Sequence, residues 1–180
     1  MRLIAVIALL ALLTPCIAVS DNVITGPYKV SFDLGLNKSD YNVTAQDPKE
    51  TEELSGETGI DYSIDIANNT GLRFATITIK YFTDETPVIT GSIWKQVLDD
   101  SDGKDPRLFN YHSAVRNIDG ASGAISSGTT ELYSGVFIDA YYAIYQPRFD
   151  PKHVVVGIFS TFPWEEGTLQ LLKTIHVEKA

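Results

Sequence analysis

Two segments near the C-terminus are apolar on both faces of a β-strand, and they constrain the fold more than any other feature. Within 132–145, only Asp139 interrupts the apolar residues from Val136 onwards, and 154–162 is mostly apolar at both alternations. A strand with one face in water alternates apolar and polar residues, whereas a strand with two apolar faces is covered on both sides. The two segments therefore predict a central antiparallel pair with a layer of structure on each side.

The rest of the chain predicts further strands and two helices. Alternating or β-branched stretches indicate strands, and prolines at the start of two apolar stripes indicate helices. The expected strands are 28–34, 41–45, 61–66, 74–82, 113–118, 121–127 and 175–177, and the expected helices are 87–98 and 163–174. Segments 28–34 and 41–45 are expected to form a hairpin, and the acidic stretch 46–59 an exposed loop. We therefore predict an α+β fold, with an antiparallel sheet of six or more strands and helices packed on it.

The N-terminus has the features of a secretory signal peptide. Arg2 precedes an apolar run over 3–13, and small residues follow, so that cleavage after Ser20 or Ala18 is expected. The run is shorter than the roughly 20 apolar residues that span a bilayer, although an uncleaved anchor is an alternative. Lipid attachment at Cys16 is a second alternative, because 13–16 resembles a lipobox in which Pro15 replaces the expected Ala or Gly.

The expected organisation is a signal peptide over 1–20, a short tether over 21–26 and a single α+β domain over 27–180. The only cysteine, Cys16, lies in the expected signal peptide, so the mature domain has no disulfide. The net charge of −9 disfavours nucleic acid and anionic membranes as partners. We expect an extracytoplasmic protein, secreted or loosely attached to the surface, with no integral membrane segment after cleavage.

The order of elements resembles the PsbP-like α/β/α sandwich family. That order is β-β, β-β-helix, β-β, β-β-helix-β behind an export signal, and it is clearest over 135–177, where WEEGTLQLLKTI follows the strand 154–162. The resemblance implies an extracytoplasmic α/β/α sandwich with an accessory or assembly role and no enzymatic activity. The chain is also similar to acidic, sequon-bearing proteins exported by archaea. No functional residue is carried over, because no site motif of the family is matched.

Known motifs for metal and catalytic sites are not found in the sequence. Placing Gly103 at the sixth position of an EF-hand loop puts Leu98 first and Phe109 last, and neither is a calcium ligand; an irregular calcium site in 99–105 is the alternative. The three histidines lack zinc spacing. There is no Gly-x-Ser-x-Gly turn and no phosphate-binding loop. We therefore predict no cofactor, no metal and no catalytic residue.

Asp139 is the one charged residue within an otherwise apolar strand. Burial of an unpaired carboxylate costs several kcal/mol. Either the strand is exposed at this point, or Asp139 has a partner such as a tyrosine hydroxyl or Arg148. A functional role is the alternative, because active sites collect such groups.

Three N-glycosylation sequons begin at Asn37, Asn42 and Asn68. They lie in expected turns or strand edges, where a glycan would be accessible on an exported chain. Such triplets also arise by chance, and their use depends on the organism. Glycosylation at these residues is therefore a prediction that rests on export.

Three classes of function are compatible with these features. The leading hypothesis is a non-enzymatic secreted or cell-surface domain that binds a partner protein or supports an envelope assembly, in an oligomeric state that the sequence leaves open. The second is a small-ligand or cation-binding module that uses acidic loops or an aromatic cleft around Trp94 and Trp164, although core packing explains both tryptophans more simply. The third is a hydrolase, which would require Asp139 and other carboxylates or histidines to converge in one cleft.

Overall fold

The computed structural model describes residues 20–52, 57–70, 73–161 and 165–180. The expected signal peptide up to residue 19, including Cys16, lies outside these ranges, and so does Trp164. The described chain is mostly β, with 56% strand and 17% helix, and its strands form two sheets. The predicted α+β class and the α/β/α sandwich are therefore wrong, because a second sheet occupies much of the space that helices were expected to fill.

The larger sheet has eight strands in the order β3-β5-β6-β10-β9-β8-β7, with β4 also paired to β5. The strands are β3 Tyr41–Ala45, β4 Lys49–Glu52, β5 Thr58–Asn68, β6 Arg73–Phe82, β7 Leu108–Ile118, β8 Ala121–Tyr133, β9 Val136–Tyr145 and β10 Val154–Thr161. All neighbouring pairs are antiparallel. The predicted pairing of 132–145 with 154–162 is confirmed as β9 with β10, but residues 132 and 133 belong to β8.

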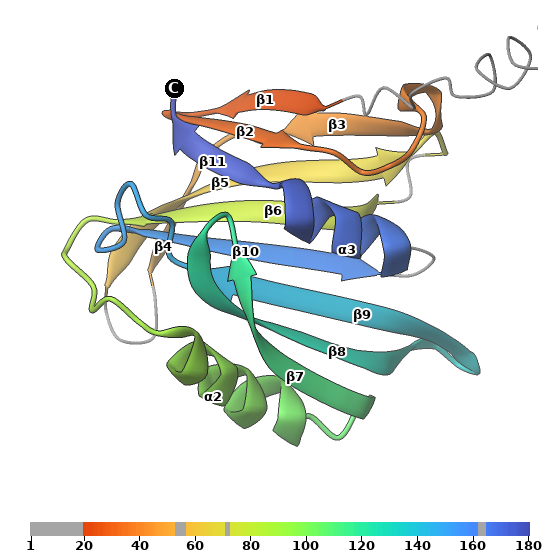
Figure 1. The fold of residues 1–180 in the computed structure, drawn as a ribbon. Coiled ribbons are helices and arrows are strands. Elements are labelled where there is room, and N and C mark those ends of the chain that lie inside the picture. The colour runs from red at the N-terminus through yellow and green to blue at the C-terminus, as the bar shows by residue number, and fades with distance from the viewer. Residues whose placement is uncertain (1–19, 53–56, 71–72, 162–164) are drawn as a thin grey trace, which may run out of the picture.

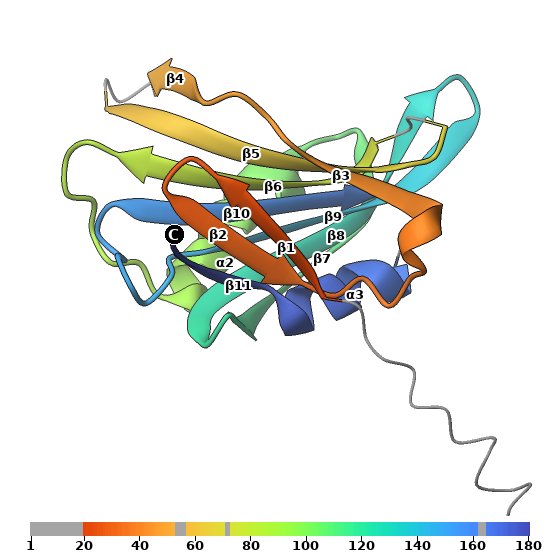
Figure 2. The ribbon, with the colours of Figure 1, turned by 90° about the horizontal axis from the view of Figure 1, so that it is seen from above.

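The smaller sheet and the two helices lie on opposite faces of the larger sheet. β1 (Asp21–Thr25), β2 (Tyr28–Phe32) and β11 (His176–Lys179) form the smaller sheet. Figures 1 and 2 show this sheet and α3 (Glu165–Thr174) on one face, and α2 (Gly91–Ser101) on the other. Two single-turn 3₁₀ helices, η1 (Lys38–Asp40) and η2 (Asp102–Lys104), precede β3 and follow α2.

Two hydrophobic cores result from this layering. The core between the sheets contains Tyr28, Val30, Phe32 and Val177 of the smaller sheet, Leu171 and Leu172 of α3, and Ile64, Ile66, Ile77, Ile79, Val154, Val156 and Ile158 of the larger sheet. The second core lies under α2 and contains Trp94, Leu98 and Ala124, with Tyr142, Ile144 and Val155 packed against them. The second core is much smaller, so the larger sheet is covered unequally on its two faces.

Several local predictions for the short strands are wrong. The expected tether 21–26 contains strand β1, which pairs with β2. The expected hairpin of 28–34 with 41–45 is wrong, because β2 pairs with β1 and β11, while β3 pairs with β5 in the other sheet. The expected loop 46–59 contains β4. In contrast, the strands expected over 61–66 and 74–82 do pair with each other, as β5 with β6, and so do those expected over 113–118 and 121–127, as β7 with β8.

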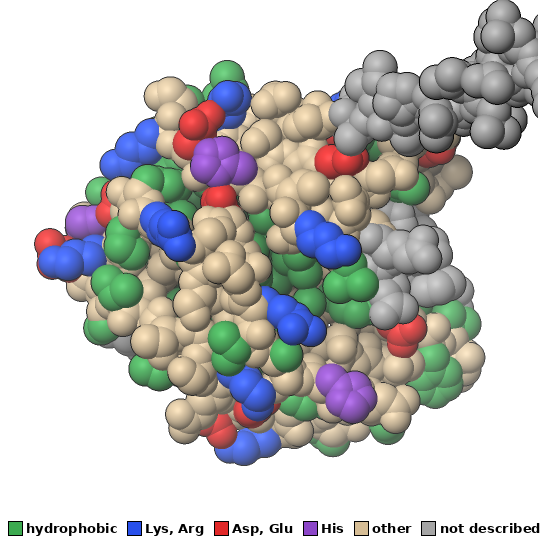
Figure 3. Space-filling view, in the orientation of Figure 1, with side chains coloured by type: hydrophobic (Ala, Val, Ile, Leu, Met, Phe, Trp, Pro, Cys, Tyr) green, Lys and Arg blue, Asp and Glu red, His purple; other side chains and the backbone are tan. Residues whose placement is uncertain are grey.

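The part of the chain that the structure describes contains no helix with both the length and the hydrophobicity needed to cross a membrane. The helix expected over 87–98 begins four residues later, at Gly91, with Thr90 in an extended conformation at its N-cap. On the face drawn in Figure 3, acidic and basic side chains are interspersed. Charge on that face does not mark a binding surface.

Candidate functional site

The face of β10 that carries Val155, Gly157 and Phe159 lines a groove and is not fully covered. Val154, Val156 and Ile158 are buried against the smaller sheet, but Phe159 on the opposite face is 47% exposed. Two adjoining hollows lie on that opposite face, and Tyr142 and Phe159 line both of them. We call these two hollows together the β10 groove.

The first hollow lies between β5, β6, β10, β9 and α2, and has a volume of about 560 Å³. The second lies between η2 and the adjoining parts of β7, β8 and β9, and has a volume of about 430 Å³. The first hollow is lined by Val155 and Phe159 of β10 and by Thr76 and Thr78 of β6. The groove therefore offers both an apolar wall and hydrogen-bonding groups.

Trp94 provides the link between α2 and the first hollow. Its side chain is 7% exposed and packs in the core under α2, which confirms core packing, and it also lines the hollow. Its indole N–H is buried and has no hydrogen-bond acceptor among the described residues. Most buried N–H groups in proteins are paired, so an unpaired one points to a water or a ligand as acceptor.

Tyr142 separates the two hollows. A Cβ atom added at Gly157 would lie 3.0 Å from the Tyr142 Oη, so the glycine allows the phenol to approach strand β10. Burial raises the pKa of the Tyr142 phenol, and the negative charge of Asp102 raises it further. The hydroxyl therefore stays protonated at neutral pH and can donate a hydrogen bond within the groove.

The groove carries more negative than positive charge. Among the described residues, its lining contains two cations, Lys80 and Arg107, and five carboxylates: Glu57, Asp61, Asp102, Asp105 and Glu131. Each cation already contacts a carboxylate of the lining, since Lys80 Nζ lies 3.7 Å from Asp61 and Arg107 lies 2.8 Å from Asp105. Hydrogen bonds from the Arg107 side chain and backbone lower the pKa of Asp105 to about 2.

The C-terminal end of α2 is held to β7 and β8 by hydrogen bonds. The hydroxyl of Tyr111 donates to Asp99 over 3.1 Å, and that of Ser126 donates to Asp102 over 2.9 Å. Asp99 also pairs with Lys95 one turn earlier at 2.6 Å. These contacts fix the position of η2, which forms one wall of the second hollow.

The N-terminal end of α2 is held by the loop between β9 and β10. Gln146 is 5% exposed, and its side-chain carbonyl accepts from the Ile89 N–H at 2.6 Å while its amide donates to the Pro87 carbonyl at 2.9 Å. The Lys152 carbonyl accepts from the Thr86 N–H at 2.7 Å. The segment before α2 is therefore bonded to this loop instead of starting the helix at Pro87, as the sequence predicted.

We expect Gln146→Leu to lower the free energy of unfolding by about 1–3 kcal/mol, because it leaves the partly buried Ile89 N–H without its acceptor. Urea denaturation of the mature chain measures the change. Thr86→Val is the matched control. It removes the hydrogen bond from Thr86 Oγ1 to the Lys152 carbonyl, which joins the same two loops but is exposed to solvent. The control is expected to change stability by less than about 0.5 kcal/mol. Equal losses in the two variants would show that Gln146 does not hold the segment before α2.

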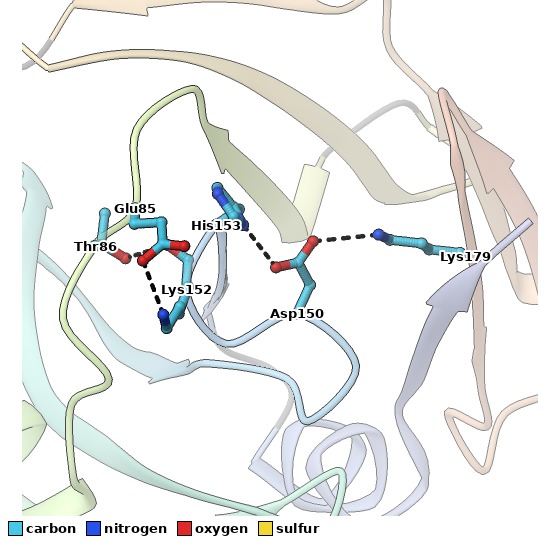
Figure 4. Close-up of polar contacts among 6 residues, drawn as sticks. All are labelled: Glu85, Thr86, Asp150, Lys152, His153 and Lys179. Atoms are coloured by element: carbon cyan, nitrogen blue, oxygen red, sulfur yellow. Dashed lines mark hydrogen bonds and ion pairs between the residues drawn. The ribbon is translucent and has the colours of Figure 1, made fainter.

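A cluster of polar side chains surrounds the same loop (Figure 4). Asp150 contacts His153 at 2.9 Å and Lys179 of β11 at 3.2 Å, while Lys152 contacts Glu85 at 2.8 Å. The ring of His153 stacks on Tyr81 with 5.9 Å between ring centres. The described residues contain no group of three histidine, cysteine or acidic side chains placed to hold a metal ion. The cluster joins β11 and two loops, and we interpret it as structural.

Acid is expected to weaken this cluster. Burial raises the pKa of Asp150, but the contacts with His153 and Lys179 outweigh it and leave that pKa below its ordinary value. A carboxyl with a lowered folded-state pKa stabilises the protein above its unfolded pKa of about 3.9, and this stabilisation is lost as the pH falls through the folded pKa. Asp150→Asn should therefore lose stability at pH 7 and show a smaller further loss in acid than the parent. Urea midpoints at neutral and acid pH test this; parallel losses in both proteins would contradict it.

The structure does not bring Asp139 into the groove. Asp139 lies exposed on β9 and accepts a hydrogen bond of 2.8 Å from Thr129 Oγ1. Of the two structural explanations, the exposed strand is correct, and the side-chain partner is a threonine of β8 instead of a tyrosine or Arg148. The convergence of Asp139 with other acidic groups, which the hydrolase hypothesis requires, is not seen in the groove.

The three sequons lie together at one corner of the larger sheet. Asn37 precedes η1, Asn42 lies on strand β3, and Asn68 is opposite Tyr41 in the β3–β5 pair. Asn37 and Asn42 are exposed, whereas Asn68 is half-buried and accepts a 2.7 Å hydrogen bond from Thr70 Oγ1 of its own sequon. None of the three lines the groove, so glycans at this corner would start outside it.

Neither a model of a known protein family nor a curated protein matches this sequence. The resemblance to the PsbP-like family therefore stays a prediction based on the order of elements.

Proposed function

We propose that this chain is an extracytoplasmic, non-enzymatic binding domain that holds a small molecule with an apolar body in the β10 groove. The observation that carries the proposal is the half-exposed apolar face of the central strand β10, where Phe159 borders both hollows. Contiguous exposed apolar surface of this kind usually marks an interaction site. The extracytoplasmic location rests on the predicted signal peptide.

The size and lining of the groove support a small ligand. Its first hollow, of about 560 Å³, is within the range of roughly 300–1,000 Å³ that is typical of ligand pockets. Such pockets combine apolar walls with a few polar groups that orient the ligand. Here the walls are Val155, Phe159 and Trp94, and the hydroxyls of Thr78 and Tyr142 supply hydrogen bonds.

Fluorescence titration with Nile red, a neutral dye with an apolar aromatic body, tests the proposal. The mature chain is expected to bind the dye saturably at one site. Thr78→Trp should weaken binding at least about tenfold, because Thr78 lies opposite Gly157 in the β6–β10 pair and a tryptophan there would occupy the first hollow.

Ile24→Trp is the matched control. Ile24 is 65% exposed on β1 of the smaller sheet, on the other side of the larger sheet, so this variant adds the same side chain away from the groove. The control should bind the dye as the parent does. Absence of saturable binding, or equal weakening in both variants, would overturn the proposed function and leave the partner-protein hypothesis as the better one.

A further inference from the structure

The charge of the groove restricts the chemistry of its ligand. In the described part of the chain, three carboxylates line the second hollow, Asp102, Asp105 and Glu131, against one cation, Arg107. The Arg107 side chain is 83% exposed and is bonded to Asp105 through both its Nε and a terminal nitrogen, at 3.0 and 2.8 Å. One carboxylate is therefore neutralised by an outward-pointing cation, and the hollow as a whole stays negative.

We infer that the ligand is an organic cation, with an ammonium group in the second hollow beside Asp102 and an apolar body in the first hollow against Phe159. This inference rests on the proposed function of the groove. Asp102 is half-buried and already accepts hydrogen bonds from the hydroxyls of Ser101 and Ser126, which hold the carboxylate in place. A charge fixed in this way needs little reorganisation to meet a cation.

The aromatic side chains of the groove support the same assignment. Tyr142 and Phe159 line both hollows, so they border the path from the acidic end to the apolar end. The face of an aromatic ring attracts a cation within about 6 Å of its centre, and ammonium recognition commonly combines such rings with carboxylates.

An anionic ligand fits the groove poorly. It would place its charge among the carboxylates of the second hollow or beside Glu57 and Asp61 in the first, where Lys80 is the one cation and already lies 3.7 Å from Asp61. The negative charge of the ligand would be repelled by these carboxylates, and the repulsion is stronger where water is partly excluded. The distribution of charge therefore selects against anions at both ends of the groove.

Competition between a matched pair of probes tests the inference. 1-Naphthylmethylammonium and 1-naphthaleneacetate have the same aromatic body and opposite charges, and each is titrated against bound Nile red. The cation is expected to displace the dye at a concentration at least about fivefold lower than the anion, with a preference that declines as salt is added.

Asp102→Asn then assigns the preference to one residue. The amide can still accept the Ser126 hydrogen bond, so the shape is kept while the charge is removed, and the preference for the cation should fall about fivefold with little change in Nile red affinity. The control Asp100→Asn removes a charge that pairs with Lys104 and does not line the groove, and should leave the preference unchanged.

Equal competition by the two probes, or equal effects of the two variants, would overturn the inference while the groove itself stands. If Nile red does not bind saturably, the proposed function is overturned, and the inference that rests on it falls with it.

Discussion

Replacing Ile158 by alanine is expected to lower the free energy of unfolding by about 2–5 kcal/mol, the usual cost of deleting a fully buried aliphatic side chain. Ile158 is 1% exposed and lies in the core between the two sheets. The cavity left by its removal would be bordered by residues of both sheets, which cannot collapse easily because each is held in its own hydrogen-bond register.

The variant Phe159→Ala, at the next residue, should lose little stability but should lose dye binding. Phe159 is on the other face of β10 and is half-exposed, so its removal should cost only about 1 kcal/mol of stability. It should, however, weaken Nile red binding about fivefold, because the ring borders both hollows. Urea denaturation and dye titration of the two variants measure both effects. A large loss of stability in Phe159→Ala would contradict the assignment of the two faces of β10 to core and groove. A loss of dye binding in Ile158→Ala, measured under conditions in which that variant is fully folded, would contradict it too.

Trp94→Ala is expected to cost about 3–5 kcal/mol, because the indole is the largest side chain of the small core under α2. The variant should also lose Nile red binding, since the same ring lines the first hollow. Urea denaturation followed by circular dichroism measures the stability. Val97→Ala on the same helix is the control: Val97 is 44% exposed, and its loss should change stability by less than about 0.5 kcal/mol. Similar losses in the two variants would mean that α2 is not anchored through Trp94.

The strands with strong alternation could be predicted from the sequence, but the partners of the short ones could not. β1 has the sequence DNVIT, whose polar start suggested a tether, yet Asp21 is 3% exposed. Its carboxylate is satisfied by Lys38 and by a 2.5 Å hydrogen bond from the Tyr41 hydroxyl. These partners are 17 and 20 residues away, and a local pattern does not contain them. Tertiary contacts override local preference most easily in such short strands.

The predicted fold class was wrong because the sequence pattern does not show which strands pair. β2 was expected to pair with β3, the next strand that alternates strongly, but its partners are β1 and the C-terminal β11. Alternation shows which residues share a face, and it does not show which strand is the neighbour. Because β11 pairs with β2, strand β2 does not extend the larger sheet and instead forms a second sheet with β1 and β11.

The groove was only partly predictable. The aromatic cleft around Trp94 was one of the expected alternatives, but the apolar face of Val155, Gly157 and Phe159 was expected to be covered. An apolar strand face indicates contact with something apolar, and the pattern is the same whether a helix or a ligand supplies that contact. The isolated Gly157 was the available signal, because glycine within a strand often marks a close approach, here that of the Tyr142 hydroxyl.

The most direct test of the β10 groove as a ligand site follows the Trp94 indole N–H by nuclear magnetic resonance. The chain has two tryptophans, so the signal is assigned as the one that Trp94→Phe removes. During titration with 1-naphthylmethylammonium, this signal should move saturably, because the N–H lies in the wall of the first hollow and the ring current of a naphthyl body bound there would shift it. An indole signal that stays in place at saturating probe would contradict the account.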